Sequence, residues 1–285
     1  MQESYNQQTE DCRRLAESIK LTEERLERAD KLKLLLADEG KRWEATIVVM
    51  EKELQELLGN VFVAAASVAY IGPFSGSYRE IMVKRWLGFC TDVNLVVSEN
   101  YSIISTLGNP VEIRNWGVNG LPSDGVSVEN GIFCTKSNSW PLMIDPQTQA
   151  NTWIKNMESR SGKSELVVVK LNEESRYMQI FENAMITGKV VVLEEVPEEI
   201  DPALDSLIGR EVYEVDGAKQ IKFNDKDIAY DTKFKLYITT KLSNPHFLPE
   251  LTIKVTLINF TVTFEGLQEQ MLAEVVVLEK PEIEE

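Results

Sequence analysis

The sequence predicts an α/β fold, in which a parallel sheet is flanked by helices and preceded by one long coiled-coil helix. Three observations lead to this prediction. Apolar side chains follow a heptad grid over the first 58 residues, and short apolar strands alternate with helices between about residues 141 and 260. The composition, 43% hydrophobic and 27% charged, is ordinary for a folded protein, and 285 residues suffice for about two domains.

The charge composition argues against several classes of partner. Lysine and arginine number 30 against 46 acids, a net charge of −16 without any basic patch, so we expect neither nucleic acid nor an anionic membrane surface as a partner. The longest apolar run, 61–71, is far shorter than the roughly 20 residues of a membrane helix. The first residues lack the features of a signal peptide, so we expect an intracellular protein. Three cysteines and one histidine supply no zinc ligand set, and we expect no metal.

Residues 1–58 are predicted to form a coiled-coil arm, because two apolar positions in seven are typical of a coiled coil rather than of a globular surface helix. The seam residues are Ile19, Leu26, Leu36, Trp43, Ile47, Met50, Leu54 and Leu57. Thr22, Lys33 and Gly40 interrupt this seam. No second heptad stretch is present, so we expect the partner helix to come from another copy or from sequence outside these residues.

A helical connector is predicted after the arm. Beyond Gly59 the apolar pattern changes to shorter helices over 61–71 and 77–89, and Gly72-Pro73 marks the break between them. From Asn109 onward glycine, proline, asparagine and serine become frequent, which indicates loops and the start of a new domain. The predicted divisions are 1–58 for the arm, 59–110 for the connector, 111–263 for a large α/β part and 264–285 for the start of a small helical part.

The α/β part is predicted from short apolar strands that alternate with helices, a pattern typical of a parallel sheet covered on both faces. The predicted strands are 141–144, 166–171, 190–193, 234–239 and 255–260. The predicted helices are 148–157, 174–186, 203–208 and 267–279, and a hairpin is predicted over 220–230.

A parallel α/β domain invites a search for a phosphate-binding loop, where backbone amides contact phosphates and a lysine neutralises their charge. The tripeptide Gly162-Lys163-Ser164 ends like such a loop, but it precedes a strand instead of joining a strand to a helix. We therefore interpret it as an exposed loop.

The correct strand–loop–helix context lies over 141–152. Matched to the phosphate-loop pattern, it places Asp145 at the first glycine, Ala150 at the second, Asn151 at the lysine and Thr152 at the hydroxyl. The cation is lost, and a carboxylate and a proline stand where amides should face phosphate. The residues of this degenerate loop therefore argue against nucleotide binding.

Acids follow the predicted strand 190–193. Glu194 and Glu195 stand where nucleoside triphosphatases of this class hold Mg²⁺ and activate water. Further acids follow at once, however, and the phosphate-loop lysine is lost, so we favour a solvated acidic loop. Thr239, at the end of the next strand, suits a polar sensor or a strand-end cap equally well. His246 has no nucleophile and no evident acid partner, so we expect a structural role for it.

Several longer motifs are spread over the chain from end to end. They are Lys41-Arg42-Trp43, Leu58-Gly59-Asn60-Val61, Gly72-Pro73-Phe74, Gly120-Leu121-Pro122-Ser123-Asp124, Glu129-Asn130-Gly131-Ile132, Trp140-Pro141-Leu142-Met143-Ile144-Asp145-Pro146-Gln147, Trp153-Ile154-Lys155-Asn156-Met157-Glu158 and Ile238-Thr239-Thr240-Lys241-Leu242. Together these motifs resemble the dynein heavy chain, most closely its axonemal forms.

The resemblance implies a place for each segment. The arm is similar to the descending helix of the microtubule-binding stalk, the connector to helices that close the fourth AAA+ module, and the rest to the fifth module, a nucleotide-free spacer of the ring. The implied partners are the other AAA+ modules of the heavy chain, the ascending stalk helix, the linker lever and, through a stalk tip outside this sequence, the microtubule. The resemblance assigns ATP and Mg²⁺ to the parent motor, not to this segment, and it implies a location in the cytoplasm and cytoskeleton, in the axoneme of a cilium or flagellum.

Ser243 departs from the family pattern, where we expect an arginine, which calls into question an arginine-finger role toward a neighbouring module. The leading hypothesis is a non-catalytic AAA+ module with a stalk arm, which couples ATP-driven ring changes mechanically to microtubule binding. One alternative is a nucleotide-binding AAA+ domain that tolerates Asn151, with Thr152 and Glu194 holding Mg²⁺. The other is a coiled-coil scaffold that dimerises through residues 12–61.

Overall fold

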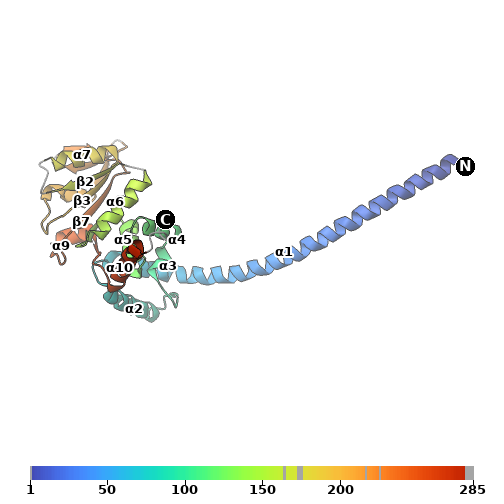
Figure 1. The fold of residues 1–285 in the computed structure, drawn as a ribbon, viewed down its shortest axis with the longest axis horizontal. Coiled ribbons are helices and arrows are strands. Elements are labelled where there is room, and N and C mark those ends of the chain that lie inside the picture. Colours follow the sequence, from blue (N-terminus) through green and yellow to red (C-terminus); the bar gives the residue numbers. More distant parts are fainter. Residues whose placement is uncertain (1, 163–164, 172–175, 216, 225, 280–285) are drawn as a thin grey trace. The chain divides into compact units, whose positions relative to one another are not determined.

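The computed structural model describes residues 2–279 except 163–164, 172–175, 216 and 225 (Figure 1). The chain divides into two compact units, Met1–Leu57 and Leu58–Glu285. Of the sequence predictions, Lys163 and Ser164, the start of the helix over 174–186 and Asp225 of the hairpin lie outside the described residues. No helix in the described part of the chain is both long and apolar enough to span a membrane.

The first unit consists of helix α1 (Gln2–Tyr70), which continues into the second unit. The seam side chains are all more than half exposed: Ile19, Leu26, Leu36, Trp43, Ile47, Met50, Leu54 and Leu57. Because α1 runs unbroken through Gly59, the predicted start of a separate helix near Val61 is wrong. Gly59 serves close packing instead, since a Cβ there would collide with the carbonyl oxygen of Val96.

A five-stranded parallel sheet forms the centre of the second unit, as predicted. The strands are β1 (Trp140–Ile144), β2 (Leu166–Lys170), β3 (Val190–Glu194), β7 (Lys235–Thr240) and β8 (Val255–Asn259). They lie in the order β2-β3-β7-β1-β8, and every neighbouring pair is parallel. Every residue of β1 and β3 is buried, which explains their unbroken apolar sequences.

One face of the sheet is covered by α7 (Tyr177–Thr187), a short turn η1 (Pro202–Leu204), α8 (Asp205–Ile208) and a small antiparallel sheet (Figure 1). The small sheet contains β4 (Val212–Val215), β5 (Ala218–Phe223) and β6 (Lys226–Ala229). Phe181, Leu207 and Phe223 from these elements share one core with Leu193 and Leu236 of the parallel sheet. The hairpin of β5 and β6 was predicted, whereas β4 was not.

The other face is covered by α5 (Gly125–Lys136) and α6 (Gln149–Ser161), with α3 (Ile103–Leu107) and α4 (Pro110–Val118) packed beside them. Phe133 and Trp153 are fully buried there, against Val192 and Tyr237 of the sheet. The remaining helices are α2 (Gly76–Asp92), α9 (Pro249–Lys254) and α10 (Phe264–Glu279). Since helices cover both faces, the predicted architecture is confirmed.

The loops predicted after Asn109 are wrong in part, because α4 and α5 form there. The residues that suggested loops are helix caps. The side chain of Asn109 accepts a hydrogen bond from the amide of Val111 at 2.9 Å, and that of Asp124 accepts one from Ser127 at 3.2 Å. Polar residues favour turns and helix N-caps for the same reason, so composition alone does not separate the two.

Arg79 of α2 ties the connector to the parallel sheet. Its side chain is 2% exposed and donates hydrogen bonds to the carbonyl of Gly72 at 2.8 Å, to Asn130 Oδ1 at 2.7 Å and to Glu129 at 3.3 Å. Asn130 in turn donates to the carbonyl of Asn259 at the end of β8, at 2.8 Å. Helix α2, helix α5 and strand β8 are therefore joined by one buried polar network.

Candidate functional site

The predicted site residues come together at the carboxyl edge of the sheet, where ligands bind in open α/β folds. Asp145 follows β1, Glu194 ends β3, and Thr239 lies near the end of β7. Ala150, Asn151 and Thr152 lie in the first turn of α6. The fold thus brings three separate stretches of sequence to one place.

The carboxylate of Asp145 contacts the amides at the start of α6. Its Oδ1 accepts a hydrogen bond from the amide of Gln149 at 2.8 Å, and its Oδ2 accepts one from the amide of Asn151 at 2.9 Å. The Asp145 residue is 1% exposed, and its own amide donates to the carbonyl of Thr240 in β7 at 2.8 Å. The amides that would face a phosphate are present, but the protein's own carboxylate occupies them.

Asn151, at the position of the lost lysine, contacts an acid of the next strand. Its side-chain amide donates to Glu194 Oε1 at 2.7 Å, and the ammonium group of Lys155 forms an ion pair with the same oxygen. Glu194 is 7% exposed, so its interpretation as part of a solvated loop is wrong. The contacts with Asn151 and Lys155 allow Glu194 to be buried, because a buried carboxylate without partners would lose its hydration and gain nothing in return.

Glu195 is half-buried and binds two lysines. Its carboxylate lies 2.6 Å from the ammonium nitrogen of Lys241 and 3.4 Å from that of Lys170. The backbone of Glu195 has a φ of 55°, a left-handed conformation that turns the chain directly after β3. The two acids after β3 thus point to different partners, Glu194 toward α6 and Glu195 toward the ends of β2 and β7.

Three threonine hydroxyls of this region lie against protein carbonyls. Thr152, at the position that would bind Mg²⁺, donates to the carbonyl of Thr148 at 2.8 Å. Thr239 is buried, with its hydroxyl 3.5 Å from the carbonyl oxygen of Leu193, and the hydroxyl of the neighbouring Thr240 donates to Val196 at 2.8 Å. The sensor and strand-end roles of Thr239 both stay predictions.

The acids of this region have shifted pKa values. Burial raises the pKa of Asp145, and the backbone amides of Asn151, Gln149 and Ala150 oppose this shift only in part. Burial also acts to raise the pKa of Glu194, but hydrogen bonds from Lys155 and Asn151 outweigh it and hold that pKa below its usual value. The hydrogen bonds of Lys241 and Lys170 lower the pKa of Glu195.

Lys155 was not predicted as a site residue. It lies four residues after Asn151, and residues with this spacing share one face of a helix. That spacing is the signal from which an ion pair with the acid facing Asn151 could have been inferred. Thr148, with a left-handed φ of 60° before α6, left no comparable signal in the sequence.

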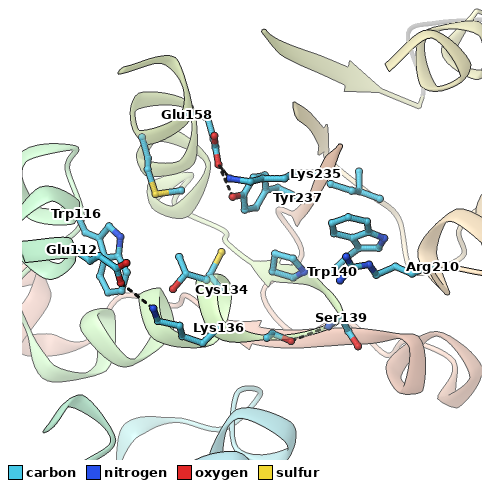
Figure 2. A pocket seen from close by; sticks show the side chains of 15 residues that line it. Glu112, Trp116, Cys134, Lys136, Ser139, Trp140, Glu158, Arg210, Lys235 and Tyr237 are labelled. Carbon is cyan, nitrogen blue, oxygen red and sulfur yellow. Dashed lines mark hydrogen bonds and ion pairs between the residues drawn. The ribbon is translucent and has the colours of Figure 1, made fainter. Parts of the chain in front are cut away.

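A cavity lies at the opposite edge of the sheet (Figure 2). It encloses about 430 Å³ near the amino ends of β1 and β7. Inside it the carboxylate of Glu158 accepts hydrogen bonds from Tyr237 at 2.7 Å and from Lys235 at 2.9 Å, and Arg210 lies over the ring of Trp140 at 4.2 Å. Its charged side chains are thus engaged with protein groups, and it lies at the edge that open α/β sheets do not use for ligands.

Among the described residues, no cluster of three or more histidine, cysteine, aspartate or glutamate side chains is arranged to hold a metal ion. The site at the carboxyl edge consists instead of carboxylates bound by amides and lysines, which link β1, β3, β7 and α6 to one another.

The parallel sheet, the strand–loop–helix unit at its carboxyl edge and the acids Glu194 and Glu195 at the end of β3 define the class, a P-loop-type α/β module, and this fold is consistent with an AAA+ domain. Comparison with known proteins identifies the family. The family model described as ATP-binding dynein motor region matches residues 114–285. The chain therefore belongs to the dynein heavy chain family.

Individual relatives match over the whole chain. It is 46% identical to dynein axonemal heavy chain 6 of Homo sapiens and 44% identical to dynein axonemal heavy chain 1 of Mus musculus, each over 285 residues. It is 42% identical over 263 residues to the dynein-1-beta heavy chain of the flagellar inner arm I1 complex of Chlamydomonas reinhardtii. These matches cover all of the chain in the first two cases and 92% in the third, but only 6–7% of each relative's length.

Proposed function

We propose that this chain is a non-catalytic AAA+ module, with a stalk arm, of an axonemal dynein heavy chain. Its relatives are dynein heavy chains of axonemes and flagella, which supports a location in the cytoskeleton of cilia and flagella. In this proposal the heavy chain carries further AAA+ modules. Within such a motor, the module transmits conformational changes between the ATP-driven ring and the stalk, and it does not hydrolyse ATP itself.

The observation that carries the proposal is the charge pairing at the carboxyl edge. A nucleotide site of this class needs a lysine for the phosphates and an acid for Mg²⁺. Here Asn151 replaces the lysine, and the acid, Glu194, is paired with Asn151 and Lys155. ATP·Mg²⁺ would have to break these contacts and displace Asp145 from the amides of Gln149 and Asn151, with no new lysine to compensate.

The arm supports the second half of the proposal. Its exposed seam requires a partner helix, and the ascending stalk helix of the same heavy chain fits that requirement. The microtubule, bound through a stalk tip outside this chain, and the linker lever are further partners in this proposal. ATP and Mg²⁺ act at other modules of the motor.

Calorimetric titration with ATP·Mg²⁺ and ADP, up to millimolar concentration, tests the proposal. We expect no saturable heat, because the charge-assisted contact of a phosphate-loop lysine contributes about 1.5–3 kcal/mol and is absent. Saturable binding near one nucleotide per chain would instead support a nucleotide-binding domain in which Thr152 and Glu194 hold Mg²⁺. That outcome would overturn the non-catalytic assignment.

The exposed seam also favours a specific alternative, a scaffold that dimerises through residues 12–61. Light scattering distinguishes it from the stalk arm. A stable parallel dimer at low micromolar concentration, abolished by Leu26→Glu together with Leu54→Glu, would support the scaffold. A monomer that binds an added helix with a matching heptad seam would support the stalk arm.

A further inference from the structure

We propose that Asp145 is an internal ligand of the degenerate phosphate loop: its carboxylate takes the place of a phosphate group and keeps the start of α6 ordered without a nucleotide. This inference rests on the proposed function, because it assumes that no nucleotide enters the loop. It adds that the loop is occupied rather than empty. The observation behind the proposal is that the carboxylate of Asp145, directly after β1, lies against the first amides of α6.

The geometry differs from that of an ordinary helix cap. A capping residue directly precedes the helix, and one side-chain oxygen accepts the amide two or three residues later. The residue in that position is Thr148, whose side chain makes no capping hydrogen bond. Asp145 lies three residues farther back, at the end of a strand, and its two oxygens divide between the amides of Gln149 and Asn151.

Asp124 provides the internal comparison. It is the N-cap of α5, is also buried, and accepts the amide of Ser127 at 3.2 Å through one oxygen. At Asp145 both oxygens accept amides at 2.8 and 2.9 Å, and the amide of Ala150 also favours the charged form. Several amides that converge on one anion are the arrangement by which a phosphate loop holds phosphate.

The surroundings explain why the anion must be internal. Asp145 is 1% exposed and lies at the positive end of the α6 helix dipole, so the loop amides replace the water that the carboxylate loses. The nearby cation Lys155 is paired with Glu194. Without the side chain of Asp145, the amides of Gln149 and Asn151 would lose their acceptor, and another anion or water would have to take its place.

The first experiment is chemical rescue of Asp145→Ala in the full chain, with formate as the probe, because formate is the group that this substitution removes. We expect the melting temperature to fall by roughly 4–10 °C and to recover with formate along a saturable curve. Hydrogen exchange at the amides of Gln149, Ala150 and Asn151 should accelerate in the variant and slow again with formate. Sodium chloride at equal ionic strength should restore neither.

Asp124→Ala is the matched control. It removes a buried capping carboxylate of the same kind, and we expect formate to leave its melting temperature unchanged, as for the wild type. An equal response of Asp124→Ala to formate, or no response of Asp145→Ala, would overturn the proposal. Either result leaves the calorimetric test of ATP binding by the wild type unaffected, so the two failures are distinguishable.

Asp145→Asn keeps the side-chain volume and tests the proposal even where Asp145→Ala does not fold. Asparagine is as good an N-cap as aspartate, but it offers one acceptor oxygen instead of two. We expect Asp145→Asn to lower the melting temperature by several degrees and to accelerate exchange at Asn151, whereas Asp124→Asn changes neither. Equal tolerance of asparagine at both positions would show that Asp145 is only a cap.

Discussion

The two units of this chain differ in how far they bury their apolar side chains, as two tryptophans show. Trp43 of the arm is 64% exposed, whereas Trp153 of α6 is fully buried and packs edge-on against Trp116 at 6.0 Å. Both lie on amphipathic helices, so the local pattern is similar in the two cases. The α/β unit supplies the surface that covers its apolar side chains, and the arm on its own does not.

Charged groups follow the same division. In the arm, Arg28 and Glu24 form an exposed pair four residues apart at 3.5 Å, one of several along the helix. In the α/β unit, Arg79 and Glu194 are buried and bound by groups far away in sequence. The comparison shows that the α/β unit, Leu58–Glu285, pairs its buried charges and covers its apolar side chains within itself, whereas the arm depends on a partner.

The largest expected contrast is in hydrogen exchange. In a monomer, amides of residues 12–57 should exchange orders of magnitude faster than those of β1, β3 and β7, because an isolated helix frays without packing of its apolar face. Exchange mass spectrometry at a concentration where light scattering confirms the monomer measures this. Strong protection of residues 12–50 in that monomer would contradict the comparison.

Truncation of the two tryptophans sharpens the contrast. Trp153→Ala should lower the free energy of unfolding by about 3–5 kcal/mol, because it opens a cavity between Trp116 and Phe260 in a closed core. Trp43→Ala is the control and should leave that free energy unchanged in the monomer. Urea unfolding monitored by circular dichroism checks both, and comparable losses would refute the division.

The buried and exposed arginines can be compared in the same way. Arg79→Met should destabilise the α/β unit by about 3–5 kcal/mol, because Glu129 and Asn130 lose a buried partner. Adding Glu129→Gln should recover part of the loss, since no uncompensated charge then remains. Arg28→Met in the arm should have no measurable effect. The idea fails if Arg79→Met unfolds at the same urea concentration as the wild type.

The breaks in the seam offer a smaller test, in the complete motor. Lys33→Leu with Gly40→Ala should stabilise one register of the stalk, by about 1 kcal/mol for the glycine alone. We expect microtubule affinity to lose its dependence on nucleotide while ATP hydrolysis persists, since a switch needs two registers of similar energy. Lys31→Leu, off the seam, is the control. Normal switching in the double variant would show that these positions merely tolerate imperfect packing.

The smallest effect concerns pH. Because the pKa of Glu194 is lowered in the folded state, the unfolded chain binds its proton first as pH falls, and the stabilisation by Glu194 is lost below about pH 4.3. Glu194→Gln should therefore reduce stability at pH 7 and converge with the wild type in acid. Asp145 has the opposite sign, since its raised pKa makes stability fall as pH rises through that value. A Glu194→Gln deficit that persists unchanged at pH 3 would argue against the pairing with Lys155.

The candidate site shows where sequence patterns suffice and where they fail. The positions of Asp145, Asn151 and Thr152 followed from the strand–loop–helix context alone, because each element carries its own periodicity. Glu194 and Glu195, by contrast, suggested a solvated loop, since the further acids that follow them do not reveal that Glu194 pairs with Asn151 and Lys155. Helices α4 and α5 were not predicted, because their N-cap residues, Asn109 and Asp124, are also typical of loops.

By itself, the sequence determined the heptad seam, the parallel α/β class, the loss of the phosphate-loop lysine and the family resemblance. These properties depend on residues close together along the chain, so local spacing is enough to identify them. Only the tertiary structure decided that the carboxylate of Asp145 turns to the amides of α6, that Asn151 meets Glu194 across 43 residues and that Arg79 joins α2 to α5. A buried polar side chain takes whichever partner the fold brings within hydrogen-bond distance, and for Asn151 and Arg79 that partner is distant in sequence.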